Sequence, residues 1–195
     1  MKELGFGYEK YDVCPNDYTL YCGKDESKIK CDTCKHLRWE GTKDDPIDEK
    51  RKVPHKVLWH FPLKPRLQRL FMSSKIASFM KWHVEGRTKD GRMRHPADTP
   101  VWQSFDYQNP EFAKDPRNVR LGLASDGFNP FKSMNVNHST WLVVLMPYNL
   151  PPWMCMKQPY FMLSLLIPGP YAPGNNIDIY LQPLIAELKE RNCGM

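Results

Sequence analysis

The sequence predicts an α/β fold in which three strands and a helix follow a basic helical region and a cysteine-containing ribbon. Three observations lead to this prediction. Apolar runs at residues 119–124, 141–146 and 160–167 have the length of strands, and the last two are nearly continuous, as in strands covered on both faces. Residues 177–188 repeat apolar side chains every three or four positions, the period of an amphipathic helix. Four of the six cysteines lie close together, between residues 14 and 34.

The size and composition of the chain indicate a folded protein outside the membrane. Its 195 residues suffice for one ordinary domain, and 41% hydrophobic with 12% aromatic residues suffice for a real core, which argues against wholesale disorder. No apolar run approaches the ~20 residues of a membrane-spanning helix, and the N-terminus has no apolar signal core. We therefore expect a soluble, non-secreted protein with no membrane partner.

The first 52 residues are expected to form a ribbon and a linker. Residues 1–39 contain short strand-like pieces at residues 18–21 and 37–39, separated by a polar loop. Residues 40–52 are polar and charged and show no periodicity, which is typical of a linker.

The cysteines of the ribbon are candidate metal ligands. Cys31 and Cys34 are separated by two residues, a spacing that lets both thiolates reach one tetrahedral Zn²⁺. Cys14 and Cys22 are candidates for the other two ligands. In a reducing compartment, clustered cysteines hold metal more often than they form disulfides. The alternative is a degenerate ribbon with free thiols.

The next region, residues 53–117, is predicted to be helical. Pro65 suits a first helical turn, and apolar residues from Leu67 to Met80 recur at helical spacing up to a terminator at Gly86. A second, shorter helix is expected after Asp98. Its apolar face would consist of Val101, Trp102 and Phe105, and Pro110 would end it.

The net charge of +6 is concentrated in this helical region. Residues 50–95 carry 13 Lys/Arg against 2 Asp/Glu, whereas residues 1–49 carry 8 against 12 and residues 101–195 carry 7 of each. Such a block suits a DNA phosphate backbone, although a solvated basic helix face gives the same pattern. The candidate DNA-binding side chains are Lys64, Arg66, Arg69, Lys75 and Lys81.

The last region, residues 118–195, holds the three strands and the final helix. Asn176 is a plausible cap for that helix, and Pro183 within it is expected to kink it or split it in two.

Asp126 is the candidate catalytic residue of this region. It follows the first apolar run and precedes Gly127, which allows the backbone to turn sharply. Phosphoryl transfer on nucleic acid commonly uses two divalent ions held by carboxylates on adjacent strands, and a carboxylate at a strand end is held rigidly. Taken alone, Ser125-Asp126-Gly127 also fits an ordinary turn.

Several long and unusual strings of this chain resemble plant CACTA (En/Spm-type) transposases. One is the string at residues 115–131, which contains Asp126, and another is Arg94-His95-Pro96-Ala97-Asp98. Further similar strings lie at residues 61–70, 148–157, 161–170 and 174–178. The resemblance extends from about residue 4 to residue 189.

The resemblance implies an element-encoded enzyme that binds transposon ends and cleaves and joins DNA in the nucleus. It implies an RNase H-like core with three acids and Mg²⁺ or Mn²⁺, in which Asp126 matches the first acid. Residues 118–195 would then be the N-terminal half of this catalytic domain. The relatives also show a cysteine where this chain has Tyr18, so that one zinc ligand is replaced, and Cys22 or His36 would have to compensate.

We therefore expect a partial RNase H-like fold in a transposase fragment that is inactive alone, because the second and third acids would lie beyond Met195. Its partners would be transposon DNA and a parent transposase or further copies of the chain. Two other hypotheses stay open. The chain is a non-catalytic DNA- or protein-binding module, or it is a non-functional remnant whose half sheet leaves an unpaired edge.

Overall fold

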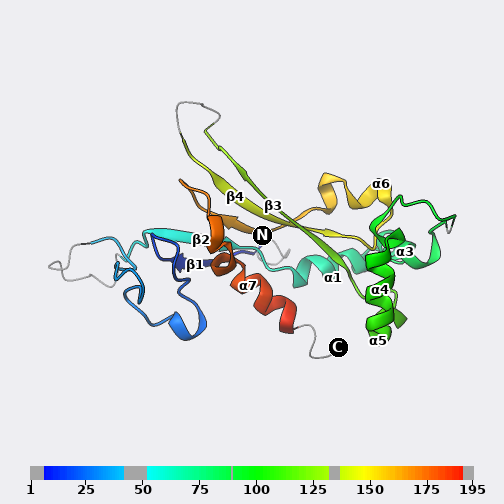
Figure 1. The fold of residues 1–195 in the computed structure, drawn as a ribbon, viewed down its shortest axis with the longest axis horizontal. Coiled ribbons are helices and arrows are strands. Elements are labelled where there is room, and N and C mark those ends of the chain that lie inside the picture. Colours follow the sequence, from blue (N-terminus) through cyan, green and yellow to red (C-terminus); the bar gives the residue numbers. More distant parts are fainter. Residues whose placement is uncertain (1–6, 42–51, 89, 132–136, 191–195) are drawn as a thin grey trace. The chain divides into compact units, whose positions relative to one another are not determined.

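The structure is a computed structural model that describes residues 7–41, 52–88, 90–131 and 137–190. It is a mixed α/β structure, as predicted, with one five-stranded sheet in the order β1-β2-β5-β4-β3 (Figure 1). The strands are β1 (Glu9–Val13), β2 (Lys56–His60), β3 (Leu121–Phe128), β4 (Thr140–Pro147) and β5 (Met162–Ile167). The α-helices are α1 (Lys64–Met72), α2 (Ser74–Phe79), α3 (Trp82–Glu85), α4 (Pro100–Gln108), α5 (Pro110–Lys114), α6 (Pro152–Cys155) and α7 (Ile177–Glu190). None of these helices is long and apolar enough to cross a membrane.

The chain divides into two compact units. The first comprises residues 1–62, 125–143 and 164–195, and the second comprises residues 63–124 and 144–163. Strands β3, β4 and β5 each contribute residues to both units.

The three predicted strands are confirmed as β3, β4 and β5. The first runs further than predicted, to Phe128, so Asp126 lies within β3 and not in a turn after it. Gly127, next to Asp126, was predicted to allow a sharp turn, but the structure gives a different reason for a glycine at this position. A Cβ atom on Gly127 would come within 2.6 Å of the Nε1 atom of Trp141, because the Trp141 indole of β4 lies across this position.

Strands β1 and β2 were not expected, and β2 lies at the start of the region predicted to be helical. They pair antiparallel, with Tyr11 opposite Leu58, and β2 also pairs antiparallel with β5. Val13 and Leu58 are buried, whereas Lys10 on the other side of β1 is exposed. The sequence of β1 is polar, so its pairing with distant residues, and not its own composition, makes it a strand.

The long helix predicted between Pro65 and Gly86 is wrong, because the structure has three helices there, α1, α2 and α3. Ser73, between the first two, has extended backbone angles (φ −90°, ψ 115°). Serine side chains compete with the helix for backbone hydrogen bonds, which disfavours serine in a helix interior. The predicted core positions are partly confirmed, since Leu67, Leu70 and Met80 are buried.

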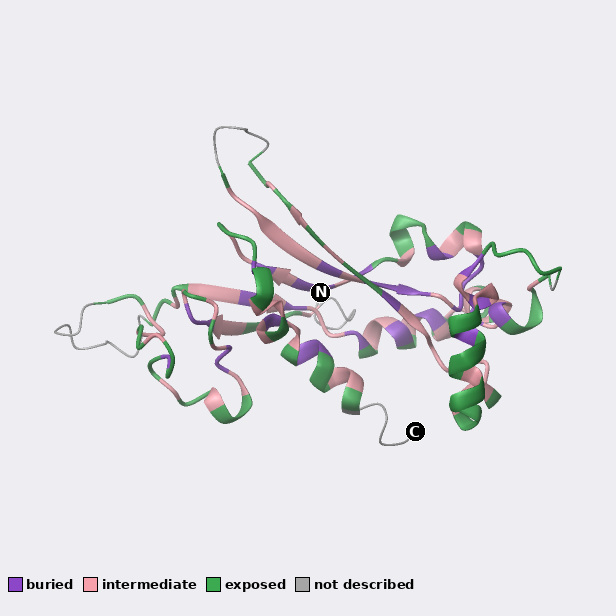
Figure 2. Ribbon diagram, viewed as in Figure 1, coloured by how far each residue is buried: buried purple, intermediate pink, exposed green. Residues whose placement is uncertain are grey.

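The second predicted helix is confirmed as α4. Thr99 caps it by accepting a hydrogen bond from the N–H of Trp102 at 3.3 Å, and Trp102 is buried. Val101 was predicted to face the core, but it is 78% exposed. Most of α4 is exposed (Figure 2). Pro110 follows the end of α4, as predicted, and begins α5.

Pro183 was predicted to kink the last helix or to split it, and helix α7 is continuous through Pro183, so it is not split. Asn176, predicted as its cap, lies in a short 3-10 turn that leads directly into the helix. Tyr180 and Leu184 are buried, as the predicted apolar face requires. Helix α7 packs against β2 in the first unit, where His60 Nε2 lies 3.5 Å from Glu187 Oε2.

Candidate functional site

The cysteine ribbon is built from two similar hairpin turns. Isolated bridges join Val13 with Leu20 and Lys30 with Leu37, so the second turn follows the first at a constant offset of 17 residues. Inside each turn, the cysteine N–H donates to a carbonyl five residues later, from Cys14 to Thr19 and from Cys31 to His36, at 2.9 Å in both cases. Each turn includes a non-glycine residue with positive φ, Asp17 (60°) and Lys35 (61°).

These two turns bring three sulfur atoms together. The Sγ atoms of Cys14, Cys31 and Cys34 all lie within 4.8 Å of one another, and those of Cys14 and Cys34 are 3.3 Å apart. A disulfide requires about 2.05 Å, so these are separate thiols. Cys14 and Cys31 are fully buried and Cys34 is partly buried. Among the residues that the structure describes, this is the one group of three or more His, Cys, Asp or Glu side chains arranged to share a metal ion.

The surroundings of the three sulfurs differ. Burial raises the pKa of Cys14 to about 12, against a smaller opposing effect of the N–H groups of Tyr18 and Asn16. Burial also acts to raise the pKa of Cys31, but hydrogen bonds from the Thr19 hydroxyl and from nearby N–H groups lower it to about 6. The Thr19 Oγ1 atom lies 3.3 Å from Cys31 Sγ. The cluster therefore contains one position prepared to carry a thiolate.

The other predicted ligand positions lie apart from this group. Cys22 Sγ donates to Gln182 Oε1 of α7 at 3.9 Å and does not join the three sulfurs. His36 is exposed and is not a member of the group either. Tyr18 is 48% exposed.

Asp17, which the sequence analysis did not single out, fixes the first turn in place. Its carboxylate accepts hydrogen bonds from Lys56 Nζ at 2.5 Å and from the Tyr180 hydroxyl. These partners belong to β2 and α7, so one side chain ties the ribbon to both elements. Tyr180 is fully buried, and burial together with the hydrogen bond to Asp17 raises its pKa far above the usual range.

Asp126 is exposed, near the end of β3. Its Oδ1 atom accepts a hydrogen bond from the N–H of Gly127 at 2.8 Å. It does not belong to any group of three or more potential metal ligands among the described residues. The arrangement presents one carboxylate on a strand, and within the described residues it is not part of a cluster of three or more ligands.

The five candidate DNA-binding side chains have different surroundings. Lys64 and Lys75 are exposed, whereas Arg69 is partly buried. Arg66 Nη2 donates to the carbonyl oxygen of Leu163, and Lys81 Nζ lies 3.9 Å from Glu85 Oε1.

A comparison with known protein families gives the lineage of the chain. A family model described as "Transposase family tnp2" matches residues 90–193, which is more than half of the chain. The chain belongs to this transposase family. The match includes Asp126, the three predicted strands and all of α7. No curated protein and no solved structure matches the chain.

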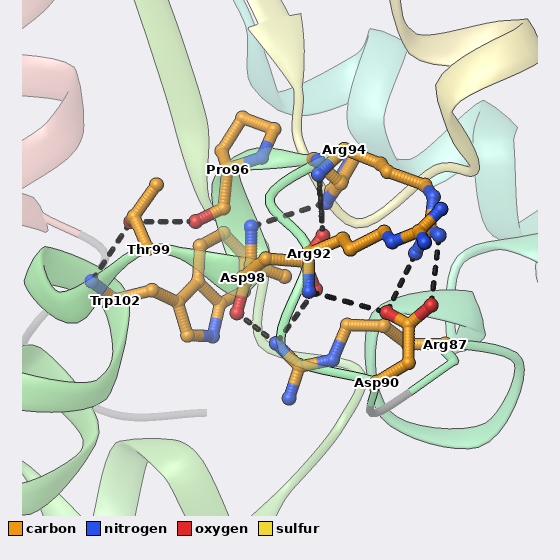
Figure 3. A network of polar contacts seen from close by, with 10 residues as sticks. Arg87, Asp90, Arg92, Arg94, Pro96, Asp98, Thr99 and Trp102 are labelled. Carbon is orange, nitrogen blue, oxygen red and sulfur yellow. Dashed lines mark hydrogen bonds and ion pairs between the residues drawn. The ribbon is translucent and has the colours of Figure 1, made fainter.

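One string that resembles transposases, Arg94-His95-Pro96-Ala97-Asp98, has a structural role in this tnp2-family chain (Figure 3). The Asp98 carboxylate accepts hydrogen bonds from the N–H groups of Arg94 and His95, both at 3.0 Å, and lies 3.5 Å from Arg87 Nη1. Burial acts to raise the pKa of Asp98, but these donors lower it overall. The network closes the turn that leads into α4, and nothing in it resembles a catalytic site.

A second string of this kind also serves the fold. Asn149 is fully buried, its Oδ1 accepts a hydrogen bond from the N–H of Arg120 at 2.7 Å, and its Nδ2 donates to the carbonyl of Asn118 at 2.9 Å. These contacts hold the backbone just before β3 of the transposase domain. The Arg120 guanidinium stacks on the Trp102 ring, 3.9 Å from its centre.

Proposed function

We propose that this transposase chain acts in DNA transposition of the CACTA type. In this proposal it binds transposon-end DNA in the nucleus and supplies Asp126 as one ligand of a catalytic Mg²⁺ or Mn²⁺ site. The observation that carries the proposal is the position of Asp126, exposed on strand β3 inside the region that matches the transposase family.

The order of elements around Asp126 supports an RNase H-like arrangement. Three consecutive strands, β3, β4 and β5, are neighbours in the sheet, and helix α7 follows them. This succession fits the first half of an RNase H-like core, with Asp126 on its first strand.

The same geometry supports the proposal that the chain does not cleave DNA by itself. Two-metal catalysis needs carboxylates from adjacent strands. Among the strands that the structure describes, β3 is the last in the order, and β4 beside it contains no Asp or Glu. A single carboxylate does not order two divalent ions in water, because Mg²⁺ keeps its hydration shell unless several ligands replace it. The remaining acids would come from a parent transposase or another partner.

DNA binding is proposed to depend on the basic residues of α1 and α2. Lys64 and Lys75 are exposed and lie in the most basic part of the chain. Each phosphate contact contributes about 0.9 to the slope of log K against log salt concentration.

The test combines DNA binding and cleavage measured on the purified chain. We expect salt-sensitive binding to transposon-end DNA, with no nicking in Mg²⁺ or Mn²⁺. Replacing Lys64 and Lys75 by Gln is expected to reduce the salt slope by about two, because two phosphate contacts are lost. The matched control replaces Lys114 and Lys157, which are exposed and lie outside the basic block, and leaves the slope unchanged.

Two outcomes would contradict the proposal as a whole, and a third would contradict the role of Asp126 in it. Metal-dependent nicking that disappears in Asp126→Asn would show that the chain is catalytically complete. DNA binding that is insensitive to salt and to the loss of Lys64 and Lys75 would remove the basic helices from the interface. The third outcome has two parts. The chain binds DNA in a salt-sensitive way, and Asp126→Asn leaves the DNA cleavage seen in the presence of a parent transposase unchanged. This outcome would favour a non-catalytic binding module.

A further inference from the structure

We propose that Cys14, Cys31 and Cys34 hold one Zn²⁺ ion whose fourth ligand is a water molecule and not a protein side chain. This site lies in the first 40 residues, outside the part of the chain that matches the transposase family. It is therefore independent of the proposed role of Asp126.

The three sulfurs fit a tetrahedral zinc ion. With Zn–S bonds of about 2.3 Å, ligand sulfurs in a tetrahedron are about 3.8 Å apart. The three Sγ atoms lie within 4.8 Å of one another and the shortest pair is at 3.3 Å, so binding needs only small side-chain shifts. Three thiol ligands, with two fully buried, favour Zn²⁺ over Mg²⁺ or Ca²⁺, which prefer oxygen ligands. Each cysteine binds the ion as a thiolate, and a cysteine that still carries its thiol proton releases it to solvent.

Hydrogen bonds around the sulfurs also suit a bound metal. The hydroxyl of Thr19 approaches Cys31 at 3.3 Å, and backbone N–H groups of each turn point to the cysteine that begins it. Such donors stabilise thiolates that carry negative charge in a metal site, and they fix the orientation of the ligands.

Other side chains of the ribbon that could supply a fourth ligand have other partners or are exposed. The carboxylate of Asp17 binds Lys56 and Tyr180, and Cys22 lies against Gln182. Tyr18 is largely exposed, and a neutral phenol is a poor zinc ligand. Within the described chain, no fourth His, Cys, Asp or Glu joins the three cysteines.

Tyr21 gives independent support for a polar occupant beside the sulfurs. It packs with Cys14, Cys31 and Cys34 in one buried cluster and is only 2% exposed. Its hydroxyl is buried and has no hydrogen-bond partner among the residues that the structure describes. A buried, unpaired hydroxyl costs about 1–3 kcal/mol, and a metal-bound water is a group that would satisfy it.

A zinc ion with a water ligand would have two consequences. It would tie the two hairpin turns together, as a structural zinc does. It would also exchange its water for a nitrogen or sulfur ligand from solution, which a site with four cysteines does not do.

The experiment uses the full chain purified without chelator. Zinc content is measured directly, and the ion is then replaced by Co²⁺, whose absorption spectrum reports the number of thiolates and the coordination geometry. We expect one metal per chain, a charge-transfer intensity that corresponds to three thiolates, and a shift of the visible bands when imidazole replaces the water. Substitution of Cys14, Cys31 or Cys34 by Ser is expected to weaken metal binding at least tenfold. Cys22→Ser and Cys155→Ser are matched controls, because both thiols lie outside the group, and they should leave stoichiometry and spectrum unchanged.

Several results would overturn the proposal. These are a metal-free chain that does not take up Zn²⁺ or Co²⁺, a four-thiolate spectrum that imidazole does not change, and a loss of one thiolate in Cys22→Ser. If the Ser variants of the three ligands do not fold, the unaltered chain and Cys22→Ser still decide, through thiolate count and imidazole response.

Discussion

The contact of Asp17 with Lys56 and Tyr180 is expected to be a major source of stability in the first unit. The side chains of Asp17 and Lys56 are only 15% and 9% exposed, and their charged atoms are 2.5 Å apart. The Tyr180 hydroxyl donates to the same carboxylate oxygen as the Lys56 ammonium. Asp17→Ala would therefore leave a buried cation without its counter-charge and a buried hydroxyl without its acceptor.

The expected loss of stability in Asp17→Ala follows from the burial of this ion pair. Removing one partner of a buried ion pair costs about 3–5 kcal/mol, because the other charge stays in a poorly solvated place. A domain of this size has a total stability of about 5–15 kcal/mol, so Asp17→Ala alone would remove a large part of it. Lys56→Met removes the ammonium and leaves the carboxylate with the Tyr180 hydroxyl. The double variant lacks both charges and should cost less than the two single variants added together.

The assay is urea denaturation of the two single variants and the double variant, followed by circular dichroism. A coupling energy of at least about 1.5 kcal/mol between Asp17 and Lys56 is expected from the double-mutant cycle. Asp32→Ala is the control. It removes a partner of Lys28 in an exposed pair and should have no measurable effect. A cost of less than about 1 kcal/mol for Asp17→Ala, or additive single effects, would refute the reasoning.

Three further variants test other parts of the structure. Asp98→Asn should lower the free energy of unfolding by about 2 kcal/mol, because a charged acceptor of two N–H groups is lost. The pKa of Asp98 is lowered in the folded chain, so the stability that its carboxylate adds is present above its ordinary pKa of about 4 and disappears as the pH falls through the lower folded value. The measurement is the melting temperature as a function of pH. The same pH dependence in Asp98→Asn as in the unaltered chain would contradict this reasoning. Gly127→Ala should lower the free energy of unfolding by about 1–3 kcal/mol, because Trp141 must move to make room for the new Cβ atom. Gly7→Ala is the control. A Cβ atom at residue 7 meets nothing within 4 Å, so this variant should be neutral in the same melting experiment. Tyr18→Cys should change the Co²⁺ spectrum to that of four thiolates and abolish its response to imidazole. The reason is that the N–H of residue 18 already contacts the sulfur of Cys14. An unchanged spectrum would show that residue 18 does not lie at the fourth coordination position.

Local sequence patterns were enough for β4, β5 and α7. Residues 141–146 and 160–167 are apolar almost without interruption, and burial on both faces is the common reason for such a pattern. The stripe from Tyr180 to Leu188 likewise includes the buried positions Tyr180 and Leu184, although Ile185 on the same stripe is exposed. In these segments, the composition of the element itself determines its structure.

Strands β1 and β2 were not predictable in this way. Residues 9–13 are mostly polar, and they form a strand because residues 56–60, far along the chain, pair with them. Contacts of this kind leave no periodic signal in a short segment. The break at Ser73 was missed for a related reason, since the apolar spacing continues across it and hides the change of backbone direction.

The cysteine site was predictable in part. The spacing of Cys31 and Cys34 predicted a shared metal, but spacing alone did not show that Cys14, and not Cys22, would be the third sulfur of the group. The offset of 17 residues between the two hairpins was the signal that could have done so, because it aligns Cys14 with Cys31 and Leu20 with Leu37. Cys22 has no equivalent in that alignment.

The charge of the basic block gives an upper limit for its DNA contacts, because the fold uses part of it. Residues 50–95 contain 13 Lys/Arg, yet several of these side chains have internal partners. Lys56 binds Asp17, Arg66 binds the carbonyl of Leu163, Arg87 binds that of Ala97, and Arg94 forms a two-bond pair with Asp90. A cation that already has an internal partner gains less from a phosphate, because it must give up that partner first. Lys64 in α1 and Lys75 in α2 have exposed side chains, whereas Arg66 and Arg69 are partly buried, and this difference in exposure is the physical reason for choosing the two lysines to test whether this transposase chain binds DNA.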